Sequence, residues 1–141
     1  LVGVFSLDVA RLYHYLYQES GQQFCIIHSL DGFDEISLTG AFKAMTRSTE
    51  RSYVPDDLGL GTVLESDLYG GNTVEEAAGV FLNILEGNGS RAQQDVVVAN
   101  AAMALFCMDE SSGLDNCLGR ARESLESGKA EEAFKKLAGN N

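Results

Sequence analysis

The stretch LVGVFSLDVARLYHYLYQESGQQFCIIH, residues 1–28, decides the fold class. It holds two short apolar runs typical of buried strands, LVGVF at 1–5 and QFCIIH at 23–28. Between them, Ser6 is the expected N-cap of a helix and Gly21 its expected terminator. The apolar residues of this segment recur at helical spacing: Val9, Leu12, Tyr13 and Leu16.

A connection of this length and character suits a right-handed crossover between two parallel strands, and it is too long for a hairpin. We therefore expect LVGVF and QFCIIH to pair in parallel, directly or across one intervening strand, with the helix on one face. Parallel strands need helices on both faces of the sheet. The predicted fold class is α/β: a layered, mixed and mostly parallel sheet flanked by helices, with a hairpin excursion.

The hairpin is expected from two strand-like runs, FKAMTR at 42–47 and RSYV at 51–54, because only polar residues separate them. Residues 55–72 are rich in turn formers and read as an excursion loop. Helical patterns follow over 73–87 and 90–108, and the second of these is apolar on nearly all sides. Residues 113–139 read as two amphipathic helices that meet near Ser127 and Gly128.

The size and charge of the chain limit its class. Its 141 residues suit one domain, and 45% hydrophobic with 22% charged residues is an ordinary globular composition. A net charge of −11 repels a nucleic-acid backbone, so we expect no nucleic-acid partner. The most apolar run, residues 96–108, is shorter than the roughly 20 residues of a bilayer span, so we expect no membrane partner.

The three cysteines lie far apart in the sequence and form no C-x-x-C pair: Cys25, Cys107 and Cys117. This pattern predicts neither a zinc knuckle nor a disulfide framework, and it fits a reducing, cytoplasmic location. No base lies near them in sequence, so nucleophilic catalysis is not indicated. The chain also opens without Met, in what reads as mid-strand, and we expect it to be a fragment whose upstream neighbour is missing.

The densest polar cluster follows the second predicted strand, in the segment HSLDGFDEISLTG at 28–40. In an open parallel sheet, ligands bind beyond the carboxyl ends of strands, where this loop would lie. The adjacent carboxylates Asp34 and Glu35 could share one Mg²⁺, which takes one or two protein carboxylates and completes its shell with water and phosphate oxygens. A plain surface turn remains the alternative, because Asp and Gly favour turns for backbone reasons alone.

Three further features have simple structural interpretations. We expect His28, at the end of an apolar strand, to be a hydrogen-bonded core or rim residue rather than a catalyst. The Gly70–Gly71 pair before a helix could cradle phosphate, but Thr73 and Glu76 fit a capping box, and negative charge on that turn opposes an anion. Asn100 lies in an apolar helix and is expected to bond a neighbouring loop.

The segment HSLDGFDEISLTG resembles the metal-binding loop of anthranilate phosphoribosyltransferases. Three more segments look like the C-terminal portion of that family in the same order: DLYGGNTVEEAA at 67–78, VVVANAAMAL at 96–105 and ARESLESGKA at 121–130. Ser29 is a departure, since many members carry glycine after the histidine. The change leaves the carboxylate pair intact and puts in doubt how closely the backbone approaches substrate there.

The resemblance implies a two-domain enzyme related in fold to the nucleoside phosphorylases. Residues 1–141 would be a single α/β domain fragment, the C-terminal portion of the large domain, truncated at its N-terminal side. The implied reaction transfers phosphoribosyl from phosphoribosyl pyrophosphate to the amine of anthranilate, in tryptophan biosynthesis. The implied ligands of the Mg²⁺ cofactor are Asp34 and Glu35.

The family's Gly-Thr-Gly-Gly-Asp pyrophosphate loop and its anthranilate-contacting segments have no counterpart in the chain. We therefore expect the fragment alone to be inactive and the full-length enzyme to be a homodimer, formed through its helical domain. Two alternatives stay open. One is an enzyme of the pyrimidine nucleoside phosphorylase type, and the other is a non-catalytic, acidic binding or assembly module.

Overall fold

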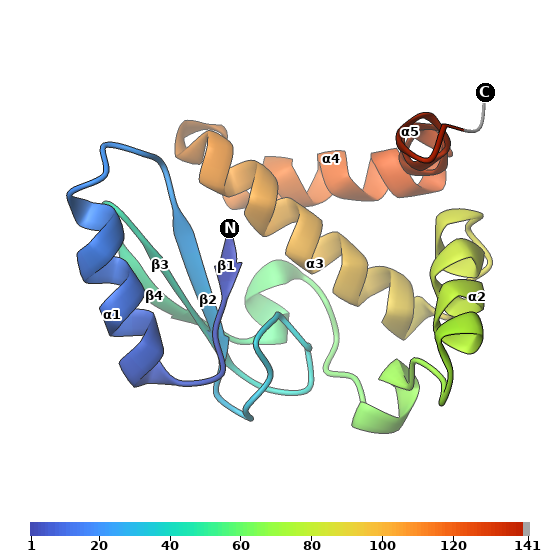
Figure 1. The fold of residues 1–141 in the computed structure, drawn as a ribbon, viewed down its shortest axis with the longest axis horizontal. Coiled ribbons are helices and arrows are strands. Elements are labelled where there is room, and N and C mark those ends of the chain that lie inside the picture. Colours follow the sequence, from blue (N-terminus) through green and yellow to red (C-terminus); the bar gives the residue numbers. More distant parts are fainter. Residues whose placement is uncertain (140–141) are drawn as a thin grey trace.

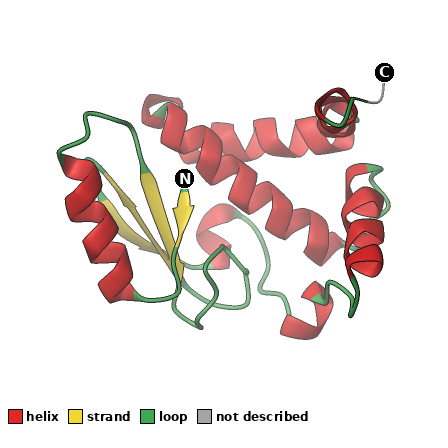
Figure 2. Ribbon diagram, viewed as in Figure 1, coloured by secondary structure: helices red, strands yellow, loops and turns green. Residues whose placement is uncertain are grey.

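The computed structural model describes residues 1–139 as a mixed sheet with helices on both of its faces (Figure 1; Figure 2). The elements are, in chain order, β1 (Val2–Gly3), α1 (Leu7–Gln18), β2 (Cys25–Ser29), β3 (Phe42–Thr46), β4 (Glu50–Tyr53), α2 (Val74–Leu85), α3 (Arg91–Met108), α4 (Leu114–Glu126) and α5 (Lys129–Leu137). Short 3₁₀ helices lie at Pro55–Leu58, Glu65–Leu68 and Glu110–Ser112. The helices over 73–87, 90–108 and 113–139 are thus confirmed, as is the excursion between β4 and α2.

The strands lie in the order β1-β2-β3-β4. β1 pairs in parallel with β2, Val2 opposite Ile26, which confirms the predicted crossover. β2 with β3 and β3 with β4 are antiparallel, and the second of these pairs is the predicted hairpin. The expectation of a mostly parallel sheet is therefore wrong. Residues 30–41 between β2 and β3 contain no helix, and without a crossover element the chain can only reverse direction.

Helix α1 covers one face of the sheet (Figure 1). Ser6 caps it as predicted, its hydroxyl accepting from the Val9 amide at 3.3 Å. Ala10 packs against Ile26 of β2 and Met45 of β3 in a small buried cluster. The apolar stripe read from the sequence is buried only in part, because Leu12 and Leu16 are 58% and 62% exposed.

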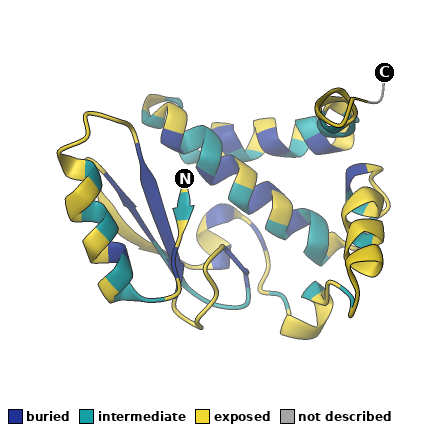
Figure 3. Cartoon of the chain, in the orientation of Figure 1, coloured by how far each residue is buried: buried dark blue, intermediate teal, exposed yellow. Residues whose placement is uncertain are grey.

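Helix α3 covers the opposite face. Successive residues of β2 point to opposite sides of the pleat, so Ile27 meets α3 while Ile26 meets α1. Ala99 and Met103 of α3 are fully buried against this face, and every residue of β2 is buried (Figure 3). The other side of α3 packs on α4 through a second cluster, so the α3 sequence is apolar on both of these faces.

An ion pair fixes the α3–α4 packing. The Asp95 carboxylate accepts from the Arg122 guanidinium of α4 at 2.7 Å and from Arg91 at 2.8 Å, while its side chain is only 8% exposed. Helices α4 and α5 meet at Gly128, whose φ of 78° lies in the left-handed region that glycine tolerates, and this confirms the predicted junction. No helix within residues 1–139 has both the length and the apolar character needed to cross a bilayer.

Candidate functional site

Asp34 and Glu35 lie on the loop that leaves the carboxyl end of β2, as the sequence predicts. Both side chains are exposed. Within residues 1–139, neither carboxylate forms an ion pair with lysine, arginine or histidine. The loop thus presents two adjacent anionic groups that are free to take a ligand.

The backbone under these carboxylates is tightly held. The Ser29 hydroxyl donates to the Glu35 carbonyl at 2.5 Å, and the Ile36 amide donates to Oδ1 of Asn100 in α3 at 3.0 Å. The carbonyl of Asp34 lies over Gly3 of β1, so closely that a Cβ on that glycine would be 1.7 Å from the oxygen. β1, β2 and α3 therefore fix one short segment together.

Asp31, the third acidic residue of the loop, has an internal role. Its carboxylate accepts from the hydroxyls of Thr39 and Ser37, and it packs against Gly40. These bonds close the far end of the loop on the return toward β3. The Asp31 carboxylate is thus engaged within the loop, whereas the carboxylates of Asp34 and Glu35 accept no hydrogen bond from residues 1–139.

The donor set fits Mg²⁺ and does not fit a protein-only metal cage. Among the described residues no three His, Cys, Asp or Glu side chains come together in a metal-binding arrangement. Mg²⁺ in phosphate-handling sites typically uses one or two carboxylates and keeps water and phosphate oxygens as its other ligands. Two exposed, adjacent carboxylates on a fixed loop meet that requirement.

His28 is a hydrogen-bonded rim residue, as expected. The residue is 8% exposed, and its Nδ1 lies 2.9 Å from the Val4 carbonyl. Because a carbonyl only accepts, Nδ1 is the protonated nitrogen, and the bond joins the end of β2 to the chain that leaves β1. The histidine supports the strand pair beneath the loop.

The Gly70–Gly71 turn belongs to a helix cap, which confirms the capping interpretation. The Thr73 hydroxyl accepts from the Glu76 amide at 3.1 Å. The Glu76 carboxylate accepts from the Asn72 amide at 2.6 Å, one residue earlier than in an ideal capping box. The Asn72 and Glu76 amides at this cap are therefore engaged by side chains of the cap itself.

The cysteines offer no nucleophile. All three are buried and unpaired. Burial raises the pKa of the Cys25 thiol from its ordinary value of 9.0 to about 12, so the thiolate is negligible near neutral pH. This agrees with the expectation drawn from the sequence.

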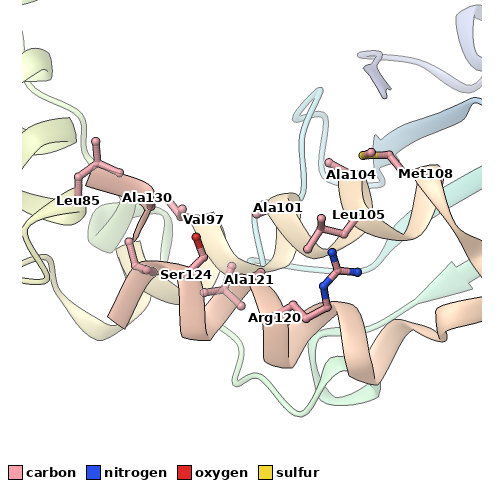
Figure 4. Close-up of a pocket in the computed structure, with 12 residues that line it drawn as sticks. Leu85, Val97, Ala101, Ala104, Leu105, Met108, Arg120, Ala121, Ser124 and Ala130 are labelled. Atoms are coloured by element: carbon pink, nitrogen blue, oxygen red, sulfur yellow. The ribbon is translucent and has the colours of Figure 1, made fainter. Parts of the chain in front are cut away.

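An apolar groove of about 410 Å³ lies between α3 and α4, well away in sequence from the carboxylate loop (Figure 4). Its lining is almost entirely aliphatic, with Arg120 and Ser124 as its polar side chains. Such a surface can bind apolar groups, but it holds no acid, base or metal ligand. The carboxylate loop is thus the better candidate for chemistry.

The two candidate carboxylates are visible in the sequence, whereas the groups that hold their backbone are not predicted as such. Gly3 had a readable signal, since glycine inside a strand often marks a close approach of another backbone. Asn100 had one too, as an amide within an apolar helix, and its predicted bond to a loop is confirmed. Ser29 had none, because a small residue at a strand end fits many environments.

Comparison with known proteins agrees with this fold. Residues 1–131 match the family model described as glycosyl transferase family, a/b domain. The chain is 48% identical over 136 residues to the anthranilate phosphoribosyltransferase of Cytophaga hutchinsonii, and 49% over 137 residues to that of Bacteroides fragilis. These alignments cover 96% and 97% of the chain but only 42% and 41% of those proteins, so the chain spans about two fifths of their length.

Two solved structures share the fold. The anthranilate phosphoribosyltransferase of Thermus thermophilus superposes with a TM-score of 0.85 at 24% identity, covering 96% of the chain and 41% of that structure. The Saccharomyces cerevisiae enzyme in complex with PRPP and Mg gives 0.77 at 21%, covering 94% and 38%. With the family model matched over nearly the whole length, the chain belongs to the glycosyl transferase family, as part of its a/b domain.

Proposed function

We propose that the chain is the C-terminal part of the large domain of an anthranilate phosphoribosyltransferase, a two-domain enzyme. The observation that carries the proposal is 48–49% identity to such enzymes over nearly the whole chain. The exposed carboxylates of Asp34 and Glu35, beyond β2, support the proposal because they could bind the Mg²⁺ that the reaction requires. The substrates would be phosphoribosyl pyrophosphate and anthranilate, and the full-length enzyme would be a homodimer.

In this proposal Asp34 and Glu35 hold Mg²⁺. The amine of anthranilate forms a bond to C1 of the ribose as the bond from C1 to pyrophosphate breaks, and the amine loses a proton. A Mg²⁺ held by these two carboxylates would supply Lewis-acid stabilisation of the negative charge on the departing pyrophosphate.

The chain's own contribution is to place two carboxylates at the end of β2 and to keep cationic side chains from neutralising them. A metal site requires its ligands in a fixed geometry, and the anchored loop backbone supplies it. Other groups that recognise the substrates would come from the rest of the enzyme, and for that reason we expect residues 1–141 alone to be inactive.

The test replaces both carboxylates in the full-length enzyme, Asp34→Asn with Glu35→Gln, and measures the initial rate against Mg²⁺ concentration. Either kcat or the affinity for Mg²⁺-bound phosphoribosyl pyrophosphate should fall by at least about 10-fold. Thermal stability should hardly change, by about 0.5 kcal/mol, because exposed loop carboxylates contribute little. An unchanged Mg²⁺ dependence in the folded variant would remove these residues from the site, and a variant that unfolds would favour the surface-turn interpretation.

A control is the double variant Glu131→Gln with Glu132→Gln, which neutralises another adjacent acidic pair, on α5, a helix that packs on α4 and α2. Unlike the carboxylates of the loop, Glu131 forms an ion pair with Lys135. It should leave the Mg²⁺ dependence unchanged. The substrate assay also separates the alternatives. Turnover of a pyrimidine nucleoside with phosphate, without turnover of anthranilate, would indicate a phosphorylase, and no turnover of either would favour a binding module.

A further inference from the structure

The peptide unit between Glu35 and Ile36 is hydrogen-bonded on both sides by side chains from separate elements. Its carbonyl accepts from the Ser29 hydroxyl of β2 at 2.5 Å. Its N–H donates to Oδ1 of Asn100 in α3 at 3.0 Å. One peptide plane, the one that follows the Glu35 side chain, is thereby held between a strand and a helix.

The side chains of Ser29 and Asn100 are themselves held in place. Ser29 is 1% exposed and pairs with Phe42 in the β2–β3 ladder. The Asn100 amide group donates to the Ile36 carbonyl at 2.8 Å and to the Val96 carbonyl of its own helix at 2.9 Å. Because its oxygen and nitrogen are both engaged, the amide cannot turn without losing three hydrogen bonds.

The hydrogen bonds from Ser29 and Asn100 hold only the backbone at Glu35 and Ile36. The Glu35 side chain beyond this peptide is exposed and takes part in no ion pair within residues 1–139. This arrangement fixes the backbone from which the Glu35 side chain extends and leaves the Glu35 carboxylate accessible to a metal ion. Mg²⁺ demands near-ideal octahedral geometry, so a ligand that starts from a loose backbone binds it less well.

We propose that Ser29 and Asn100 are positioning residues that set the Glu35 carboxylate for Mg²⁺ by clamping the Glu35–Ile36 peptide. This inference rests on the proposed function, because it assigns a purpose to the clamp only if Glu35 binds metal. Both residues would act through this one peptide group and not as ligands of the metal. Removing either side of the clamp should weaken metal-dependent binding more than it weakens the fold.

The test is a double-mutant cycle in the full-length enzyme, read by calorimetric titration with Mg²⁺-bound phosphoribosyl pyrophosphate. Ser29→Ala and, separately, Asn100→Ala should each weaken binding by about 10-fold, the low end for residues that orient metal ligands. In a Glu35→Gln background the same substitutions should change the affinity by less than about 2-fold, because the group they position no longer binds the metal. This non-additivity is the signature that a merely structural role would lack.

A matched control removes another buried hydroxyl at the opposite end of the same strands. Thr46 is 2% exposed, pairs with Cys25 at the start of β2, and accepts from the Ser48 and Thr49 amides. Thr46→Val should lower the melting temperature and leave the affinity for the Mg²⁺ complex unchanged. It separates a general loss of stability from a specific effect on the loop.

Several results would overturn the inference. One is wild-type affinity in both alanine variants; another is the same fold-change with and without the Glu35 carboxylate. If Ser29→Ala does not fold, as judged by circular dichroism, the Asn100→Ala cycle decides. A wild-type enzyme without phosphoribosyl transfer would refute the proposed function, whereas an active enzyme with an additive cycle would refute the clamp alone.

Discussion

The contact between Gly3 and the Asp34 carbonyl allows a sharp test of how the loop is held. In Gly3→Ala the new Cβ would lie 1.7 Å from the carbonyl oxygen and 2.8 Å from its carbon. Ordinary contact begins at 3.4 Å, so β1 and the loop must separate by about 1.7 Å. Both partners are backbone, and no side chain can rotate away to make room.

Both β1 and the loop are held by hydrogen bonds that resist their separation. β1 is held by its parallel pairing with β2 and by the bond from the Val4 amide to the Ile27 carbonyl at 2.9 Å. The loop is held by Ser29 and Asn100. Overpacking typically costs about 1–3 kcal/mol, and with both sides restrained we expect the upper part, about 2–3 kcal/mol.

Urea denaturation of the full-length enzyme measures this loss as a lower midpoint at constant slope. The matched control is Gly79→Ala in the middle of α2, where a Cβ would meet nothing within 4 Å. Because alanine favours helix over glycine, that variant should gain about 0.5–1 kcal/mol. A Gly3→Ala enzyme as stable as wild type, with an unchanged Mg²⁺ dependence, would refute the close-contact reasoning.

Three further predictions concern the framework. Asp95→Asn should destabilise the enzyme by about 1–3 kcal/mol in urea denaturation, because Arg122 loses its carboxylate partner at 2.7 Å and keeps only the Glu126 carboxylate, 4.0 Å away; a loss below about 0.5 kcal/mol would contradict this. Thr73→Ala should cost about 1 kcal/mol by removing the α2 cap, whereas the neighbouring Val74→Ala, at a side chain 81% exposed, should cost much less in the same measurement. The raised pKa of Cys25 should make stability fall as pH rises from 9 towards 12, because the thiol ionises in the unfolded chain first; Cys25→Ala should lose this component of the pH dependence, and an identical profile would contradict the assignment.

The sequence was most informative where the pattern was local. The crossover from β1 to β2, the β3–β4 hairpin and the α4–α5 junction each follow from periodicity and turn residues within one segment. The expectation of a mostly parallel sheet is wrong because it extends the parallel first unit to the whole sheet. The decisive fact, a helix-free connection over 30–41, was present in the sequence and implied a reversal.

The candidate site divides in the same way. Two neighbouring carboxylates after an apolar strand are visible in the sequence, and so is the requirement that Asn100 find a partner. The partner of Asn100 is Ile36, 64 positions earlier in the chain. This pairing depends on how α3 crosses the sheet, and no local sequence pattern predicts it. The exposure of Leu12 and Leu16 has a similar origin, since the face of α1 that meets the sheet is set by tertiary packing.

The long sequence separation of the Asn100–Ile36 contact has a kinetic consequence. A bond that spans 64 positions forms only after the intervening chain has closed into a loop, which is entropically costly before other contacts compensate for it. The β3–β4 hairpin and the α4–α5 pair can form from neighbouring residues, whereas the loop after β2 lacks its hydrogen bonds to Asn100 until α3 docks on the sheet. Hydrogen exchange at the Ile36 amide during refolding should therefore become slow in the last phase, and the affinity for Mg²⁺ should develop together with that protection and not with the earlier gain of helix.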